Sequence, residues 1–118
     1  MNRIVKVIVA VILLSFLNSP SKAQNSKEVI TDTLQVSGVC GMCEERIENA
    51  ALIKGVKKAE WSVDQQSLIV VYRADKTNME TIARAIADAG HDNELVTSTD
   101  EKYDRIHNCC KYRESEPH

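Results

Sequence analysis

The sequence predicts an α+β domain in which two helices cover one face of a four-stranded sheet. Three observations lead to this fold class. Short runs of alternating or β-branched apolar residues are typical of strands, and two longer segments carry apolar residues at helical spacing. Glycines punctuate the boundaries between most of these segments. The resulting order, β-α-β-β-α-β over about 70 residues, is that of a ferredoxin-like sandwich, and a short helical tail follows it.

The first strand and the first helix are predicted on either side of a cysteine-containing loop. Residues 29–37 alternate between apolar and polar side chains and predict the strand, which Gly38 ends. Residues 40–43 form the loop and the start of the helix, and acidic residues follow where the helix dipole favours them. We expect this helix to stop at Gly55. Its apolar face consists of Ile47, Ala50 and Ala51.

The second half of the domain supplies three strands and one helix. The strands are expected at residues 56–63, 67–72 and 94–97. Thr77 or Asn78 caps the second helix, and Gly90 ends it. Apolar residues at i, i+3, i+4, i+7 and i+10 form its buried stripe: Met79, Ile82, Ala83, Ile86 and Ala89.

The two ends of the chain differ from this domain, which we place at residues 28–98. Residues 1–23 have the layout of a secretory signal peptide: a basic start, an apolar run and small residues before Ala23. The alternative is an uncleaved N-terminal anchor, although the apolar run is shorter than the roughly 20 residues that a spanning helix needs. Residues 99–118 form a tail with a His/Cys cluster. The expected location is therefore outside the cytoplasm, in the periplasm.

The charge of the chain argues against nucleic acid as a partner. The formal net charge is −2, and removal of residues 1–23 would take three basic side chains and no acidic ones. A mildly acidic protein without a basic stripe binds nucleic acid poorly. No carboxylate pair or Ser/His/Asp set stands out either, so we expect no enzymatic activity.

The chain has four cysteines, in two local pairs. Cys40 and Cys43 are three residues apart at a predicted helix start, so both sulfurs can point at one spot. Backbone N–H groups and the helix dipole favour thiolates there, and thiolates select soft ions. Two sulfurs alone suit Cu(I), which accepts low coordination numbers. Hg(II) and Zn(II) remain alternatives, although structural zinc prefers four ligands.

The segment around these cysteines resembles the heavy-metal-associated (HMA) domain family, which includes copper chaperones, domains of metal-pumping ATPases and periplasmic mercury-binding proteins. The resemblance begins at residues 36–43, continues through residues 46–50 and spans roughly residues 29–97. It implies that Cys40 and Cys43 are the metal ligands. The partner would be a membrane metal transporter or another metal-binding domain. In this chain the loop before Cys40 is one residue shorter than usual and lacks the family's Met.

Three further residues are candidate ligands. His91 follows the second helix, in a loop that in this fold lies beside the cysteine loop, and it could bind the ion or tune its charge. Cys109 and Cys110 could approach Cys40 if the tail climbed from the far end of the domain along the uncovered sheet face. The alternatives are a surface histidine and a tail that simply packs, since free cysteine is often buried. Residues 111–118 are expected to fray.

The sequence thus favours a protein that binds a soft heavy-metal ion and transfers or sequesters it. A thiol–disulfide oxidoreductase is the alternative, because the same two cysteines suit that chemistry. A thioredoxin-like enzyme needs a proline beside its active site, however, and the only proline after the leader is Pro117.

Overall fold

A computed structural model describes residues 28–115. The predicted leader, residues 1–23, lies outside the described residues. Within residues 28–115 no helix is both long and apolar enough to cross a membrane. The elements are β1 (Val29–Gln35), α2 (Gly41–Ala51), β2 (Val56–Ser62), β3 (Ser67–Arg73), α3 (Met79–Asp88), α4 (Asp100–Asp104) and a 3-10 turn (Asn108–Cys110).

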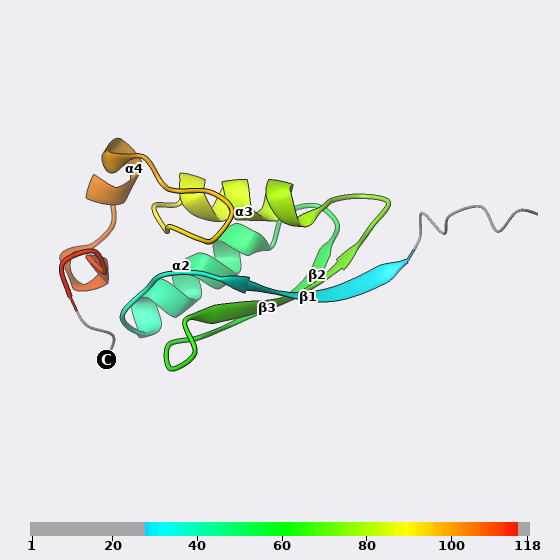
Figure 1. Ribbon diagram of the computed structural model, residues 1–118, viewed down its shortest axis with the longest axis horizontal. Helices are drawn as coiled ribbons and strands as arrows, with labels where there is room; N and C mark the ends of the chain where they lie inside the picture. Colours follow the sequence, from blue (N-terminus) through cyan, green and yellow to red (C-terminus); the bar gives the residue numbers. More distant parts are fainter. Residues whose placement is uncertain (1–27, 116–118) are drawn as a thin grey trace, which may run out of the picture.

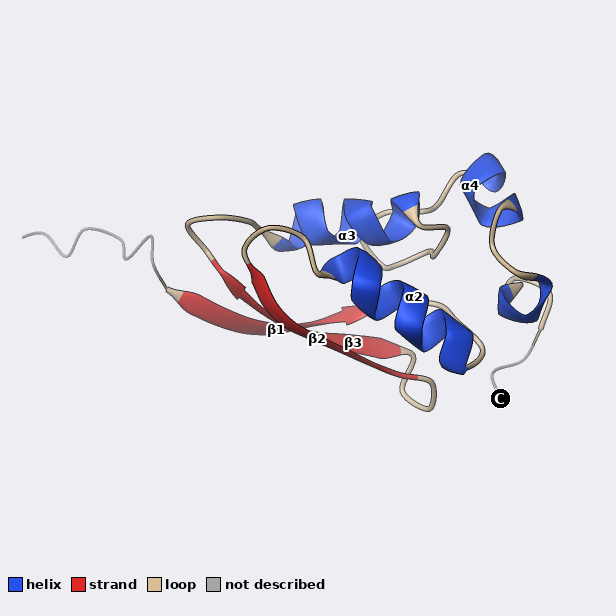
Figure 2. Cartoon of the chain, turned by 180° about the vertical axis from the view of Figure 1, so that it is seen from behind, coloured by secondary structure: helices blue, strands red, loops and turns tan. Residues whose placement is uncertain are grey.

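The described strands form one antiparallel sheet in the order β1-β3-β2. Helices α2 and α3 lie side by side on the same face of this sheet, and no helix among residues 28–115 covers the other face (Figures 1 and 2). The α+β ferredoxin-like prediction is therefore confirmed, as is the cap of the second helix: the Asn78 side chain accepts a hydrogen bond from the Thr81 N–H.

A single apolar core joins the sheet to the helices. Trp61 belongs to this core, as its alternation with Ala59 and Val63 predicts, and its indole N–H donates to Val36 O at 3.0 Å. Burying each aliphatic side chain contributes about 1.5–3 kcal/mol relative to exposure. The fully buried members from the sheet and the two helices include Leu34, Val36, Leu68, Val70, Ile47, Ile82 and Ile86.

The fourth strand, predicted at residues 94–97, is absent from the described residues. Only an isolated bridge forms, between Val36 and Asn93. The Asn93 side chain accepts hydrogen bonds from the N–H groups of Leu95 and Val96, which folds the chain into a tight turn. The local side-chain bonds compete with the sheet, so the prediction of a strand here was wrong.

The loss of that strand changes where the tail begins. After the turn, Ser98 Oγ donates to Ala87 O at 2.7 Å, so the chain returns to the C-terminal end of α3. Helix α4 begins there and is capped by Thr99, whose side chain accepts a hydrogen bond from the Lys102 N–H. The tail therefore starts beside the cysteine loop, not at the far end of the sheet, and it packs at the end of the helix layer (Figure 1). The predicted route along the uncovered sheet face was wrong.

Candidate metal centre

The loop between β1 and α2 packs closely against the core of the domain. Val39 is fully buried, and Gly38 lies so close to its neighbours that a Cβ there would be 2.9 Å from the Trp61 ring and 3.0 Å from Cys43 Cβ. The Gly38 N–H donates to the Gln66 side chain at 3.1 Å. The space at position 38 therefore admits only glycine, and the packing fixes the backbone that leads to Cys40.

Cys40 and Cys43 occupy the first turn of α2. Cys40 is the N-cap residue, with an extended backbone, and it is half-buried. Cys43 lies one turn into the helix and is fully buried. All four cysteines of the chain are unbridged. The predicted loop and helix start are therefore found as expected, with both thiols available as ligands.

The tail brings a third sulfur to this pair. Cys110 is fully buried, and the sulfur atoms of Cys40, Cys43 and Cys110 all lie within 4.8 Å of one another. The tail backbone approaches as well: Cys40 Sγ is 3.6 Å from Cys109 O, and Cys43 Sγ is 4.0 Å from Cys110 O. Three soft donor atoms from two distant segments thus converge on one point.

The thiols differ in how readily they lose a proton. Burial alone would raise the pKa of Cys40, but the N–H groups of Cys43 and Met42 and the thiols of Cys43 and Cys110 lower it by more, so it falls below its usual value. Burial, followed by the nearby Cys43, raises the pKa of Cys110 strongly. Cys40 is therefore the readier thiolate, and the Cys110 thiol is the harder of the two to deprotonate.

Cys109 lies outside the three-sulfur cluster. It is exposed, and its Sγ is 3.3 Å from Met42 Sδ. Met42 is itself 47% exposed. The two atoms form a surface pair of soft donors beside the cluster.

His91 lies beneath the cysteine loop, fully buried, and is not part of the three-sulfur cluster. Its Nδ1 is 2.8 Å from Ser37 O, a geometry that requires the N–H on Nδ1. Burial lowers its pKa, and the nearby Arg46 lowers it further, against the opposing effects of Ser37 and Asp92. A neutral imidazole therefore ties the end of β1 to the loop after α3.

The residues that anchor the tail could not be predicted from the sequence. Residues 111–118 were expected to fray, but Tyr112 stacks on His91 with ring centroids 5.3 Å apart. Arg113 forms a two-pronged ion pair with the Asp92 carboxylate, at 2.9 and 3.0 Å. The frayed-tail expectation is thus wrong for these two residues. Their partners lie about 20 positions away in the chain, so no local pattern could reveal them.

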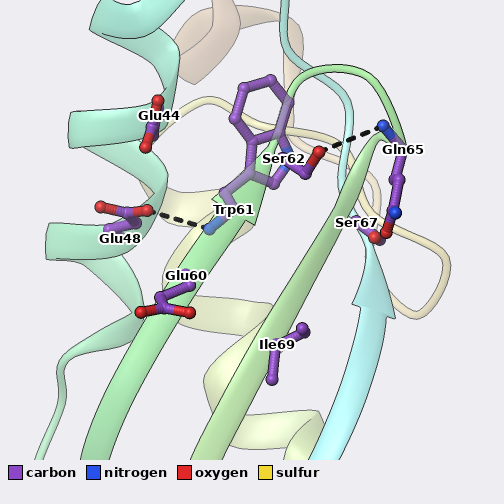
Figure 3. Close-up of a pocket in the computed structure, with 8 residues that line it drawn as sticks. All are labelled: Glu44, Glu48, Glu60, Trp61, Ser62, Gln65, Ser67 and Ile69. Atoms are coloured by element: carbon purple, nitrogen blue, oxygen red, sulfur yellow. Dashed lines mark hydrogen bonds between the residues drawn. The ribbon is translucent and has the colours of Figure 1, made fainter.

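A separate pocket between α2 and the β2–β3 edge has no sulfur in its lining. Figure 3 shows its carboxylates and the Trp61 backbone, whose N–H donates to Glu48 at 2.9 Å. Carboxylate oxygens are hard donors, and one of them already serves the sheet edge. The sulfur cluster therefore offers the donors that a soft ion prefers, whereas this pocket does not.

Comparisons with known proteins point to the same segment. The model of the family described as "Heavy-metal-associated domain" matches residues 33–92. The chain is 33% identical over 67 residues to the "Mercuric transport protein periplasmic component" of Salmonella typhi, over 55% of this chain and 74% of that protein. The same figures hold for the protein of that name from Enterobacter cloacae.

Two solved structures with TM-scores above 0.5 extend this similarity to the fold. One, "CopZ metallochaperone", is 30% identical with a TM-score of 0.52, over 54% of this chain and 98% of that chain. The other, a putative copper-ion-binding protein from Bacillus anthracis str. Ames, is 27% identical with a TM-score of 0.54, over 58% of this chain and all of that one. The family match includes Cys40 and Cys43, whereas the tail that carries Cys110 lies beyond it.

Proposed function

The chain belongs to the heavy-metal-associated domain family, and on that premise we propose that Cys40 and Cys43 hold a Cu(I) ion that the protein carries outside the cytoplasm. Heavy-metal binding by a CxxC-containing domain is the property of the family, whose carriers are not enzymes. The thiol–disulfide oxidoreductase alternative is therefore not retained. The identity of the ion, the site residues and the location are the parts that we propose.

The observation that carries the proposal is the convergence of free thiols at a helix N-terminus, with the pKa of Cys40 held below its usual value. Metal binding requires deprotonated sulfur, so a thiol that ionises readily lowers the free-energy cost of taking up the ion. The half-buried position of Cys40 also leaves one ligand accessible. An incoming thiolate from an acceptor can replace it first, which suits handover by stepwise ligand exchange.

The donor set supports Cu(I) over Zn(II). Among the described residues, the cluster of potential ligands contains only cysteines, without a carboxylate or imidazole. Structural zinc is almost always four-coordinate, and its sites usually combine cysteine with histidine or further cysteines. Cu(I) is favoured by soft sulfur ligands and does not need four of them. One of the two similar structures, that from Bacillus anthracis, is described as a copper-ion-binding protein as well.

Hg(II) is the second candidate, and a specific observation favours it. The curated relatives of this chain are mercuric transport proteins of the periplasm, 33% identical over 67 residues. Hg(II) is as thiophilic as Cu(I), and the same two sulfurs would serve it. In either case the proposed acceptor is a membrane metal transporter or another metal-binding domain, and residues 1–23 are the proposed export signal.

A competition experiment tests this proposal. The reduced protein, without residues 1–23, is equilibrated anaerobically with Cu(I), Hg(II) or Zn(II) and a chelator of known affinity for each. We expect one Cu(I) per chain, retained against an excess of Zn(II). Selective retention of Zn(II) would contradict the choice of ion, and failure to bind any of the three would contradict the function. Insulin reduction, measured in parallel, is expected not to exceed the uncatalysed rate.

A further inference from the structure

We propose that Cys110 is a third metal ligand, so that the C-terminal tail completes a three-thiolate site around the ion held by Cys40 and Cys43. This inference rests on the proposed function but goes beyond it. The family match ends at residue 92, so the third sulfur comes from a segment outside the matched domain. It turns an open two-sulfur site into one that is covered from the side of the tail.

The distances between the sulfur atoms fit a trigonal site. With metal–sulfur bonds of about 2.3 Å, as for Zn–S, three sulfurs around one ion lie about 4.0 Å from each other. The sulfurs of Cys40, Cys43 and Cys110 are mutually within 4.8 Å in the metal-free protein. Contraction by less than about 1 Å, within the reach of side-chain adjustment, would bring all three into the first coordination shell.

The tail is fixed on the N-terminal side of Cys110. Tyr103 and Ile106 are buried in the main core, only 5% and 4% exposed. The packing is close: a Cβ on Gly90 would lie 2.5 Å from the Ile106 side chain. Lys102 also pairs with Asp88 at the end of α3. The segment before Cys110 is therefore part of the folded domain rather than a loose extension.

The tail is fixed on the C-terminal side of Cys110 as well. The Tyr112 hydroxyl donates to Gly90 O at 2.7 Å and accepts from the Asp92 N–H at 2.8 Å. Arg113 grips the Asp92 carboxylate and donates to Ser98 O at 2.8 Å. Anchors on both sides mean that Cys110 does not have to be ordered when the ion binds, so little entropy is lost.

Apolar packing explains the position of Cys110 less well than metal binding does. A buried cysteine often behaves as a small hydrophobic side chain. Cys110, however, lies next to other thiols rather than among aliphatic groups alone: its Sγ is within 4.8 Å of the Cys40 and Cys43 sulfurs and 4.0 Å from that of Cys109. Three thiols gathered at one point gain little as apolar contacts, whereas they form a complete soft-ion site once deprotonated.

The third thiolate affects how the ion is released. An acceptor that attacks at Cys40 meets an ion that is still held by two buried sulfurs, Cys43 and Cys110. Release then requires displacement of three ligands instead of two. Each ligand exchange moves one metal–sulfur bond from the carrier to the acceptor, and the released thiolate takes up a proton. The tail should therefore raise affinity and slow transfer.

The test is to count the sulfur ligands by X-ray absorption spectroscopy on the full chain without residues 1–23, loaded anaerobically with one equivalent of Cu(I). Wild type is expected to show three sulfurs. Cys110→Ser is expected to show two, and to bind Cu(I) at least about tenfold more weakly, because loss of even an outer-shell partner costs about 10–100-fold. The matched control is Cys109→Ser, which is expected to keep three sulfurs and the wild-type affinity.

Two sulfurs in wild type would overturn the inference while leaving the proposed function intact. Equal sulfur counts and affinities in wild type and Cys110→Ser would do the same. Binding of no Cu(I) by wild type would instead contradict the proposed function itself. The count in wild type does not depend on any variant folding, and circular dichroism of Cys110→Ser and Cys110→Ala checks that a loss of binding is not a loss of structure.

Discussion

The imidazole of His91 stacks on the phenol ring of Tyr112, with 5.3 Å between the ring centroids and 22° between the planes. This contact joins the segment beside the cysteine loop to the C-terminal tail. His91 holds Ser37 at the end of β1, just before the cysteine loop, and Tyr112 lies two residues after Cys110. The stack therefore fixes the position of the third sulfur relative to the first two.

Tyr112→Phe should loosen the tail without removing the stack. The substitution leaves Gly90 O and the Asp92 N–H without their partner, because both bond to the hydroxyl group. Each buried group that loses its partner costs about 1–3 kcal/mol. We expect urea unfolding of the metal-free, reduced protein to show a loss of that order. Tyr103→Phe removes only the weaker bond from the Arg113 N–H, at 3.2 Å, and should cost less; a larger effect for Tyr103→Phe would contradict this account.

Gly38→Ala should damage the cysteine loop. The new methyl group would lie 2.9 Å from the Trp61 ring, so the loop or the ring must move, and overpacking of this kind costs about 1–3 kcal/mol. Metal affinity should fall as well, since the loop positions Cys40. Gly41→Ala is the matched control, because a Cβ there has no heavy atom within 4 Å. Denaturant unfolding and Cu(I) competition of the two variants measure both effects, and equal results for Gly38→Ala and Gly41→Ala would refute the steric argument.

His91 should make the protein less stable as the pH falls from 7 to 5. Burial lowers the pKa of His91 in the folded state, so the unfolded chain takes up a proton first, below its ordinary pKa of about 6.5. The unfolded state then binds more protons, and the free energy of unfolding decreases by up to about 1.4 kcal/mol per pH unit in that window. His91→Asn keeps an N–H donor but cannot titrate. Unfolding curves of the metal-free protein at several pH values should be flatter for this variant, and a slope equal to wild type would exclude His91 as the cause.

Arg113→Lys should weaken the anchor after Cys110 even though it keeps the charge. Burial raises the pKa of Asp92, but the hydrogen bonds from Arg113 and Ser98 lower it by more, so the pKa in the folded protein lies below its ordinary value of about 4. The ionised carboxylate therefore stabilises the fold above that ordinary value, and this stabilisation is lost as the pH falls further. Lysine cannot form the two-pronged contact. We expect a loss of about 1.5–3 kcal/mol at pH 7, the range for hydrogen bonds to charged groups, and a smaller decrease in stability on acidification below pH 4. An unchanged free energy of unfolding at pH 7 would show that the contact contributes nothing.

Much of the fold was predictable because its signals are local. The stripe of α3 and its Asn78 cap are encoded within a few residues, as is the cysteine pair at the start of α2. The prediction of a fourth strand was wrong for an equally local reason, which the pattern of apolar residues does not reveal. The side chain of Asn93 bonds to the two N–H groups that a strand would need.

The third sulfur could not be placed from sequence. Its position depends on the turn at Asn93, which redirects the chain, and on pairs such as Tyr112 with His91 and Arg113 with Asp92. Each of these contacts joins residues about 20 positions apart with no repeating pattern between them. The sequence shows that Cys110 carries a soft sulfur donor, but it does not show that this sulfur lies beside Cys40 and Cys43.

The central claim is that Cys40 and Cys43 together hold the ion, and native mass spectrometry of the Cu(I)-loaded, reduced protein tests it most directly. Wild type should carry one copper ion per chain, and the double variant Cys40→Ser/Cys43→Ser should carry none after the same exposure and buffer exchange. The double variant Cys109→Ser/Asn108→Ala, altered in the tail outside the sulfur cluster, should retain the ion. One copper ion bound to Cys40→Ser/Cys43→Ser with the affinity of wild type would contradict the account.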